Sequence, residues 1–591
     1  MRIGEDLITE NAMHVLEARY LRRDGEGKIV ETPEQLFERV AHAVAEAELL
    51  HGSAAAARFW EERFHRMMAS LDFLPNSPTL MNAGTPLGQL SACFVLPIED
   101  TMESIFGTLR DAALVQRTGG GTGFSFSRLR PAGDPVASTG GTSSGPVSFM
   151  RIYDCATENI KLGGRRRGAN MGVLRVDHPD VEEFIHAKSD DASFRNFNLS
   201  VGATDEFMAA VESGGDLELR HPTGGRVIRT IPARRIFDEI CGAAWNTGDP
   251  GLIFLDTIGR ASPLPACGRI EATNPCGEVP LLPYESCNLG SINLVHFGRE
   301  QNGAATIDYE RLRTQVRDAV RFLDDVISVN RFPLDAIARQ SAANRKIGLG
   351  VMGFAEVCIL SGISYASTRA VLLAEELMEF IAREARLASI HLAETRGVFP
   401  NWSTSIYPGR GLRLRNATLT SIAPTGTISI IAGTSSGIEP LFALAYRRRN
   451  VLGDQTLAEL NPLVVRHLEK LGLDTRRVIQ SIESTGRLSA DSPERDLFVT
   501  ALEIPAEQHV RVQAAFQQHV DNAVSKTINL PTEASRDDVA QAYRLAYRLG
   551  CKGVTIFRYG SKAETMLELG LGETAEQREY FSKCDPEACR L

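Results

Sequence analysis

One short loop combines side chains that chemistry on a small molecule would need. Asn274, Cys276 and Glu278 alternate with Pro275 and Gly277, two residues that favour an irregular backbone. Such a loop can present a hydrogen-bonding amide, a sulfur and a general base to one ligand, which makes it a candidate active site. Because cysteine is often buried and Asn or Glu can cap nearby backbone, the spacing alone also fits a structural loop.

Two further cysteines are candidates for the same site. Cys287 follows Cys276 by eleven residues. Cys93 lies near the start of a short apolar run, residues 91–98, that predicts a buried strand. A cysteine at the end of a strand is well placed to face a central cavity.

Two segments rich in hydroxyl groups could hold a phosphate. Residues 73–84 contain turn formers with Ser and Thr side chains, although an ordinary connecting loop explains them equally well. Residues 421–429 follow a strand-like run at 417–420 and offer hydroxyl and amide donors around Gly426. This second loop could open a helix whose N-terminus favours an anion.

Glycine and basic residues gather in two neighbouring segments. Residues 119–145 are dense in glycine, which allows close backbone approach to a ligand, but they match neither the Rossmann nor the Walker A pattern. Residues 161–172 place Lys161 and three consecutive arginines, Arg165 to Arg167, among four glycines. This basic loop is either a solvated turn or an anion clamp, and the planar fork of arginine favours the clamp.

The last eight residues contain two cysteines, Cys584 and Cys589. The segment from residue 561 onward is polar and has no apolar periodicity after Leu571. A cysteine pair on a mobile tail can reach a buried disulfide and exchange with it, whereas the alternative is an incidental pair.

Composition excludes several classes of protein. The 591-residue chain has a formal net charge of −10, which disfavours a sequence-independent nucleic-acid binder. It has no apolar run of membrane-spanning length and no signal peptide, so we expect a cytoplasmic protein with no membrane contact. Its ten cysteines include no C-x-x-C pair, so we expect no metal site.

The pattern of elements predicts an α/β fold behind an N-terminal helical layer. Apolar spacing predicts helices at residues 34–50, where Thr32 and Pro33 form the start, and at 54–71. Strands and helices then alternate from residue 193, with helical stretches near 310–330 and 369–395. Such alternation places an active site at the strand ends.

Together these motifs resemble a ribonucleotide reductase, and more narrowly the adenosylcobalamin-dependent class II enzymes of the dimeric type. The resemblance covers nearly the whole chain and rests on residues 274–278, Cys287, Cys93, the loops at 424–429 and 164–171, and the tail cysteines. It implies a ten-stranded α/β barrel of two five-stranded parallel halves. The implied divisions are helices at 1–75, the barrel at 76–560 and a flexible redox tail at 561–591.

The resemblance also implies a role for each candidate catalytic residue. A thiyl radical on Cys276, generated with adenosylcobalamin, would abstract the 3′ hydrogen of a ribonucleotide, Glu278 would be the general base, and Asn274 would orient the substrate. Cys93 and Cys287 would be the reducing pair and end as a disulfide. Cys584 and Cys589 would reduce that disulfide and would in turn be reduced by a thioredoxin-like protein.

Binding residues follow from the same resemblance. Those implied to bind substrate are Ser77, Ser91, Ala92, Pro424, Thr425, Gly426, Thr427, Ile428 and Ser429. The resemblance also implies a site for a dNTP or ATP effector near a homodimer interface, formed by Asp100, Arg128, Arg130 and Lys161. The loop with Arg165, Arg166 and Arg167 would relay the identity of the effector to substrate choice. The expected substrate is a diphosphate.

The alternative within the family is a class I large subunit, which needs a separate radical-generating subunit. That class uses a pair of adjacent tyrosines, and no Tyr-Tyr dipeptide occurs in this sequence. Residues 558–560 match poorly the glycine loop of glycyl-radical relatives. A nucleotide-binding protein that lost catalysis is disfavoured because the four core residues Cys276, Glu278, Cys93 and Cys287 are all present.

Two departures from the family pattern shape our expectations. The first helical layer starts near residue 6, which leaves no room for an N-terminal ATP-cone, so we expect no ATP/dATP on–off control. The tail pair is separated by four residues rather than two. We expect the remaining cysteines, which are Cys155, Cys241, Cys267, Cys358 and Cys551, to be core residues.

Overall fold

The computed structural model describes residues 8–136, 140–162, 166–189, 193–301, 304–448, 457–470, 475–562 and 567–569. The tail cysteines Cys584 and Cys589 and the loop residue Arg165 therefore lie outside the described residues. For Lys161, Arg166 and Arg167 the backbone is described but the side chains are not.

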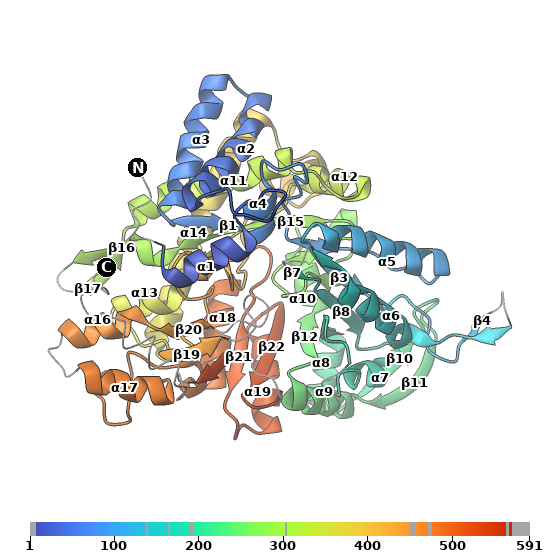
Figure 1. The fold of residues 1–591 in the computed structure, drawn as a ribbon. Coiled ribbons are helices and arrows are strands. Elements are labelled where there is room, and N and C mark those ends of the chain that lie inside the picture. Colours follow the sequence, from blue (N-terminus) through green and yellow to red (C-terminus); the bar gives the residue numbers. More distant parts are fainter. Residues whose placement is uncertain are drawn as a thin grey trace.

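The N-terminal part is helical, with α1 (Glu10–Arg19), α2 (Pro33–Ala45) and α3 (Ala54–Ala69). Helices α2 and α3 pack together at one end of the molecule, whereas α1 lies nearer its middle (Figure 1). Thr32 starts α2, because its side chain accepts a hydrogen bond from the backbone of Gln35, whose side chain bonds back to Thr32. The short 3-10 helix η1 (Glu46–Leu50) follows α2. The two helices predicted here are confirmed.

The segment at 73–84 is more ordered than the loop that its composition suggested. It contains the strand β1 (Phe73–Pro75) and the helix α4 (Ser77–Asn82). Asn76 starts α4, since its Oδ1 accepts a hydrogen bond from the backbone of Thr79 at 3.0 Å. Turn-forming residues here act as a helix cap.

Ten of the described strands form one mixed sheet, in the order β1-β15-β2-β3-β8-β9-β12-β22-β21, with β18 paired to β15. Their bounds are β1 as above, β2 (Cys93–Val95), β3 (Gly121–Ser125), β8 (Asn170–Arg175), β9 (Phe197–Ala203), β12 (Gly251–Phe254), β15 (Ser286–Asn293), β18 (Ile347–Met352), β21 (Thr527–Leu530) and β22 (Gly553–Arg558). The predicted α/β class is confirmed, but these strands do not close into a barrel through continuous ladders.

The direction of pairing divides the sheet into two parts. Strands β2, β3, β8, β9 and β12 are mutually parallel neighbours. Strands β15 and β18 pair in parallel, as do β21 and β22. The two parts meet at the antiparallel pairs β15 with β2 and β12 with β22.

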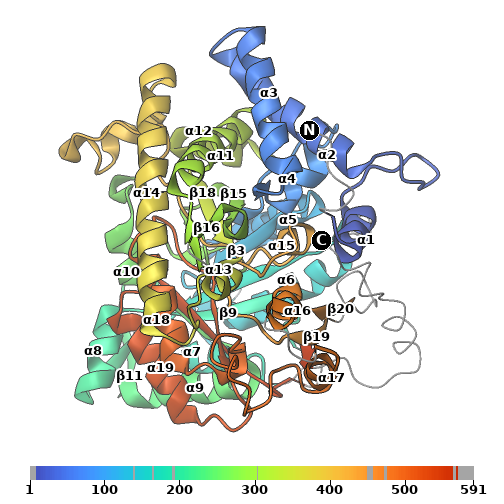
Figure 2. The same ribbon diagram turned by 90° about the vertical axis from the view of Figure 1, so that its left-hand side faces the viewer.

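Helices surround this sheet on its outer side (Figures 1 and 2). They are α5 (Met102–Arg117), α6 (Gly145–Asn159), α7 (Val181–Ile185), α8 (Asp205–Ser213), α9 (Ala233–Thr247), α10 (Leu255–Ala261), α11 (Tyr309–Val329), α12 (Asp335–Asn344), α13 (Phe354–Leu360), α14 (Thr368–Arg396), α15 (Ile428–Ile431), α16 (Pro462–Lys470), α17 (Thr475–Thr485), α18 (Ala506–Gln517) and α19 (Arg536–Arg548). Figure 2 shows α14 running along one side of the molecule beside α18. No helix in the described ranges is long and apolar enough to cross a membrane.

The remaining described strands form five two-stranded hairpins and one three-stranded sheet. They are β4 (Pro135–Val136) with β5 (Gly141–Thr142), β6 (Lys161–Leu162) with β7 (Arg166–Arg167), β10 (Asp216–Arg220) with β11 (Val227–Pro232), β13 (Ala272–Thr273) with β14 (Pro280–Leu281), β16 (Gly298–Gln301) with β17 (Ala304–Ile307), and β19 (Ala445–Arg448) with β20 (Leu457–Leu460) and β23 (Leu567–Leu569). The β13–β14 hairpin carries the candidate catalytic loop.

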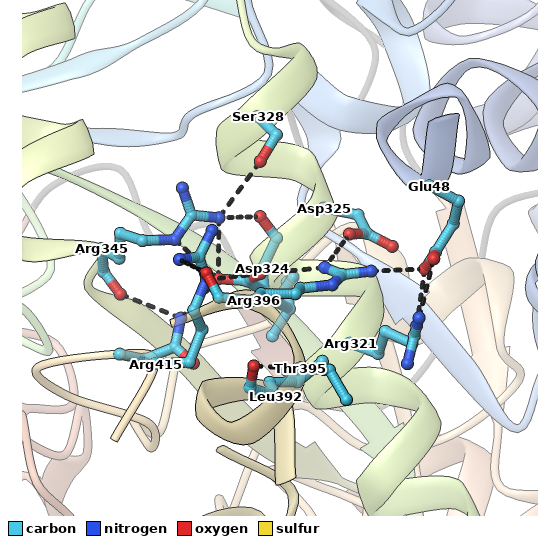
Figure 3. A network of polar contacts seen from close by, with 12 residues as sticks. Glu48, Arg321, Asp324, Asp325, Ser328, Arg345, Leu392, Thr395, Arg396 and Arg415 are labelled. Atoms are coloured by element: carbon cyan, nitrogen blue, oxygen red, sulfur yellow. Dashed lines mark hydrogen bonds and ion pairs between the residues drawn. The ribbon is translucent and has the colours of Figure 1, made fainter. Parts of the chain in front are cut away.

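A buried ionic network joins the N-terminal helices to the rest of the molecule (Figure 3). Arg396, at the end of α14 and 1% exposed, contacts Glu48 of η1 at 2.6 Å, Asp325 of α11 at 2.5 Å and Asp324 at 3.1 Å. Arg321 of α11 also contacts Glu48 at 2.5 Å. Because these charges are buried, each depends on its partners remaining in place.

Candidate active site

The residues 272–281, here named the finger hairpin, hold Cys276 at the tip of a tight turn. The backbone of Gly277 donates to the carbonyl of Asn274 at 3.0 Å, which places Pro275 and Cys276 at the two central positions of the turn. Gly277 has φ +81°, a conformation that other residues rarely adopt. Cys276 is exposed, whereas Asn274 and Glu278 at the base of the turn are buried.

Hydrogen bonds from several parts of the chain fix the finger hairpin. Asn198 of β9 donates to the carbonyl of Pro275 at 2.7 Å. The carbonyl of Glu278 accepts from the Ser421 hydroxyl and from the backbone of Ala523, each at 2.9 Å. The position of Cys276 is therefore set by contacts distant in sequence.

Two glycines of β3 make room for this hairpin. A Cβ atom on Gly123 would lie 1.7 Å from the carbonyl oxygen of Thr273, and one on Gly121 would lie 2.9 Å from Pro275. Within the glycine-rich segment, these two glycines admit the protein's own finger hairpin, and Gly121 also lines the cavity described below.

Cys93 and Cys287 face each other across two neighbouring strands. They occupy a directly paired position of the antiparallel strands β2 and β15, where the two Cα atoms lie about 4.5–5.5 Å apart. That Cα separation is within the range that a disulfide spans, and the two cysteines are not joined by a disulfide in this structure. Burial raises the pKa of the Cys287 thiol.

Cys93 is also hydrogen-bonded to the finger hairpin. The Asn274 amide donates to its sulfur at 3.1 Å, and the Asn274 oxygen accepts from the backbone of Val279 at 3.0 Å. The Cys93 thiol points to a carboxylate oxygen of Glu278 at 3.9 Å. Asn274 thus joins one member of the cysteine pair to the loop that carries Cys276.

These groups line one wall of a cavity of about 340 Å³, within the size range of small-molecule sites. The residues on this wall are Asn274, Pro275, Cys276, Glu278, Cys93, Ala92 and Gly121. Cys287 lies behind Cys93 and is fully buried. The structure therefore gathers four of the five predicted catalytic residues at one cavity and places the fifth directly behind it.

The predicted substrate loop lines the same cavity. Ser77, Pro424, Thr425, Gly426, Thr427 and Ile428 line it, and the loop leads into the short helix α15. Thr425 has φ +54°, and its hydroxyl oxygen accepts a hydrogen bond from the backbone of Gly437 at 2.7 Å. These residues present hydroxyl and backbone groups to whatever occupies the cavity.

Two predicted substrate residues do not reach this cavity. The hydroxyl of Ser91 is buried, where it donates to Asn288 and accepts from Asn330, each at 2.8 Å. Ser429 is buried against Ser436 at 3.1 Å. Their side chains are oriented into packed hydrogen-bond networks that the sequence pattern could not reveal.

Arg19 and Tyr20 are among the cavity residues that were not predicted. Tyr20 bonds to the hydroxyl of Ser77 at 2.7 Å, and Arg19 donates to Thr427 at 3.5 Å, so the end of α1 reaches the substrate loop. Both line the cavity. Nothing in the local sequence around these two residues separates them from an ordinary helix surface.

The predicted effector residues lie elsewhere. Arg130 contacts Asp100 at 2.7 Å, and Arg128 lies between Glu99 and Glu271. Partial burial lowers the pKa of Arg128, but the two carboxylates outweigh this effect and raise it. None of these residues lines the cavity of about 340 Å³.

Two of the cysteines assigned to the core are not there. Cys155 is exposed and Cys267 is half-buried, because each lies on the outer face of its helical segment. Cys241, Cys358 and Cys551 are buried as predicted. The three buried thiols have raised pKa values because of desolvation.

Two family profiles match the chain. The profile described as "Ribonucleotide reductase, all-alpha domain" matches residues 6–88. The profile described as "Ribonucleotide reductase, barrel domain" matches residues 91–413 and 409–557. Together they span most of the sequence.

Several curated proteins are similar over nearly the whole chain. The vitamin B12-dependent ribonucleoside-diphosphate reductase of Mycobacterium tuberculosis is 52% identical over 94% of this chain and 80% of the relative. The enzyme of that name from Thermoplasma acidophilum is 47% identical over 98% of this chain and 83% of the relative. The ribonucleoside-diphosphate reductase subunit alpha of Chlamydia pneumoniae is 27% identical over 92% of this chain and 58% of the relative.

Proposed function

The chain belongs to the ribonucleotide reductase family, and we propose that it reduces ribonucleoside diphosphates to 2′-deoxyribonucleoside diphosphates with adenosylcobalamin as the radical source. The observation that carries this proposal is the exposed Cys276 at the tip of the finger hairpin, beside Asn274, Glu278 and Cys93 on one cavity wall. A ribose C–H bond is too strong for acid–base chemistry, so the reaction needs a radical whose source is a cofactor.

The residues on this wall divide the reaction between them. A thiyl radical on Cys276 takes the 3′ hydrogen atom of the ribose, and Glu278 accepts the proton of the 3′-hydroxyl. Asn274 hydrogen-bonds the substrate hydroxyls. The Cys93–Cys287 pair supplies two protons and two electrons, so that the 2′-hydroxyl leaves as water and the pair ends as a disulfide. The 3′ hydrogen then returns from Cys276.

Ser77 and the substrate loop would bind the substrate phosphates. Ser77, Thr425 and Thr427 offer hydroxyl groups there, and Ala92, Pro424, Gly426 and Ile428 shape the wall around them. The hydroxyl of Ser91 hydrogen-bonds to the side chains of Asn288 and Asn330, and that of Ser429 to the hydroxyl of Ser436. We therefore assign both serines a role in positioning the site rather than in direct contact with the substrate.

The residues around Cys276 fit a cofactor that activates its thiol from the cavity. The sulfur is exposed rather than buried, and Gly121, Ala169 and Pro275 beside it are small or apolar. These three residues would lie against the cofactor. When bound, adenosylcobalamin supplies the oxidising equivalent that converts the Cys276 thiol to a thiyl radical.

We extend the proposal to the finer architecture. Single bridges between Leu349 and Thr420 and between Ile422 and Val524 support closure of the ten strands into a barrel of two five-stranded parallel halves. In this division residues 1–75 are the helical part, 76–560 the barrel and 561–591 the redox tail. Cys584 and Cys589 of that tail would pass electrons from a thioredoxin-like protein to the Cys93–Cys287 disulfide.

Exposed apolar side chains support a homodimer. Met102 and Phe106 of α5 and Ile152 of α6 are 56%, 43% and 40% exposed, and the two helices pack together. A dNTP or ATP effector would bind near this face through Asp100, Arg128, Arg130 and Lys161. The loop with Arg165, Arg166 and Arg167 would relay effector identity to substrate choice.

The test is anaerobic reduction of CDP and of CTP by the purified chain with dithiothreitol and a dNTP effector, with and without adenosylcobalamin. We expect dCDP only when the cobalamin is present, and more product from CDP than from CTP. Absence of product until a separate radical-generating subunit is added would instead establish a class I large subunit.

A further inference from the structure

A buried ion pair flanks Cys287 on the inner face of the sheet. The ammonium of Lys346 lies 2.5 Å from the carboxylate of Glu285, and these side chains are 2% and 1% exposed. Glu285 also accepts hydrogen bonds from the backbone of Leu282 at 2.7 Å and from Asn344 at 2.6 Å. The carboxylate is thus held in place and fixes Lys346, while the ammonium retains two further N–H donors.

Strand register places Lys346 next to Cys287. In the parallel pair β15 and β18, Asn288 is opposite Ile347, the first residue of β18. Lys346, the residue before β18, therefore lies beside Cys287 of β15, since paired strands are about 4.8 Å apart. A Cβ atom on Gly348 would lie 3.4 Å from the Cys287 sulfur, which shows that Cys287 lies over Gly348. Lys346 precedes Gly348 by two residues and so shares its face of the strand.

The two sulfurs of the cysteine pair differ in access. Cys93 lines the cavity, whereas Cys287 is wholly buried behind it. An external dithiol that reduces the disulfide therefore attacks Cys93. The electron pair of the broken bond then goes to Cys287, which must carry a negative charge in a buried place.

The surroundings of Cys287 make that charge costly unless a cation is close. Burial raises the pKa of its thiol, and the carboxylates of Glu278 and Glu285 act in the same direction. The ammonium of Lys346 acts in the opposite direction. Lys552, the residue before β22, donates to the carbonyl of Asp521 at 2.6 Å and lies near Lys346, but burial lowers its pKa to about 8, so Lys346 is the cation that acts on Cys287.

We propose that Lys346, held by Glu285, stabilises the Cys287 thiolate that leaves when a dithiol reduces the Cys93–Cys287 disulfide. The attacking thiolate forms a bond to the Cys93 sulfur, the Cys93–Cys287 bond breaks, and Cys287 takes the electron pair. The second thiol of the reductant then displaces Cys93 and leaves as a cyclic disulfide. The two protons of the reductant end on Cys93 and Cys287.

This inference rests on the proposed function for the origin of the disulfide, but its test does not require turnover. The full-length chain carrying Cys276→Ser, Cys584→Ser and Cys589→Ser is oxidised with diamide, and formation of the Cys93–Cys287 disulfide is verified by mass spectrometry. The rate constant for its reduction by dithiothreitol is then measured from pH 7 to 9 by acid quench and alkylation. This parent is compared with Lys346→Met, Lys346→Arg and the double variant Glu285→Gln/Lys346→Met.

The matched control is Lys188→Met, which removes another largely buried lysine, paired with Asp249 at 2.8 Å. We expect Lys346→Met to lower the rate constant by about tenfold or more at every pH, since the leaving thiol then has a higher pKa. The double variant should lower it less, by about three- to tenfold, because it also removes the Glu285 carboxylate, which raises the same pKa. Lys346→Arg and Lys188→Met should stay within about threefold of the parent.

A purely structural role for the ion pair predicts a different result. The double variant removes both charges together and avoids an uncompensated carboxylate, so it tests the proposal even if Lys346→Met does not fold. Reduction of the double variant at the parent's rate would overturn the proposal. An equal decrease of the reduction rate constant in Lys346→Arg and Lys346→Met would also overturn it. If wild-type protein forms no deoxyribonucleotide, the proposed function fails while these exchange rates still decide the role of Lys346.

Discussion

Gly123→Ala should displace the catalytic loop without touching any residue of the cavity wall. The added Cβ would lie 1.7 Å from the carbonyl oxygen of Thr273, whereas ordinary contacts are 3.4 Å or more. The finger hairpin must therefore retreat from β3 by about 1.5 Å. A displacement of about 1 Å at reacting groups can cost about 10²-fold in rate, so we expect kcat to fall by about that factor or more.

The stability of this variant should change less than its activity. Overpacking of a buried site costs about 1–3 kcal/mol, which leaves a large chain folded. The residues proposed to bind the phosphates are not altered, so KM for CDP should stay within about threefold of wild type. The assay is steady-state reduction of CDP with adenosylcobalamin and dithiothreitol, together with thermal denaturation of the same samples.

Gly259→Ala is the matched control. Gly259 lies in α10 with an ordinary φ, and among the described residues a Cβ atom there would meet nothing within 4 Å apart from its own stretch of helix. The same chemical change should leave kcat at the wild-type value and raise stability by up to about 1 kcal/mol through helix propensity. A folded Gly123→Ala variant with kcat within about threefold of wild type would refute the claim that β3 sets the position of the hairpin.

Three further predictions test other parts of the account. Glu278→Gln retains the size of the side chain but removes the general base, so kcat should fall by about 10²- to 10⁴-fold at unchanged CDP affinity; retention of kcat would exclude this role. Cys584→Ser with Cys589→Ser should retain turnover driven by dithiothreitol and lose turnover driven by thioredoxin, and equal loss with both reductants would contradict the role of the tail. Arg396→Met leaves buried carboxylates without their cation, so the free energy of unfolding should fall by about 3–5 kcal/mol in urea denaturation, whereas a loss below about 1 kcal/mol would show that the network in Figure 3 is dispensable.

The sequence predicted those parts of the fold that depend on local chemistry. Thr32 and Pro33 specify the start of α2 through a capping box, and that helix begins where expected. The alternation of apolar strands and amphipathic helices predicted the α/β class. The turn at Cys276 follows directly from Pro275 and Gly277.

Features set by packing between distant segments could not be predicted in the same way. The glycines of β3 were recognised, but only the structure shows that the carbonyl of Thr273 occupies the space they leave. Ser91 has the right composition for a binding residue, yet its hydroxyl is committed to Asn288 and Asn330. Side-chain direction of this kind depends on strand register, which local propensity does not determine.

The residues contributed by α1 illustrate the same limit. Arg19 and Tyr20 lie more than fifty residues before Ser77 in the chain, and their packing against the substrate loop joins the N-terminal helices to the cavity. The pairing of Cys93 with Cys287 across β2 and β15 is likewise a long-range contact. Only the resemblance to a known family suggested that these two cysteines act together.

The central claim is that Cys276 carries the hydrogen-atom transfer, and its most direct test is dCDP formation by Cys276→Ser beside wild type. Both proteins are assayed anaerobically with CDP, adenosylcobalamin, dithiothreitol and a dNTP effector, and CDP binding to each is measured by equilibrium dialysis. The account predicts turnover by wild type, no dCDP from Cys276→Ser and CDP affinities within about threefold of each other. Production of dCDP by Cys276→Ser at a rate within about tenfold of wild type would contradict it.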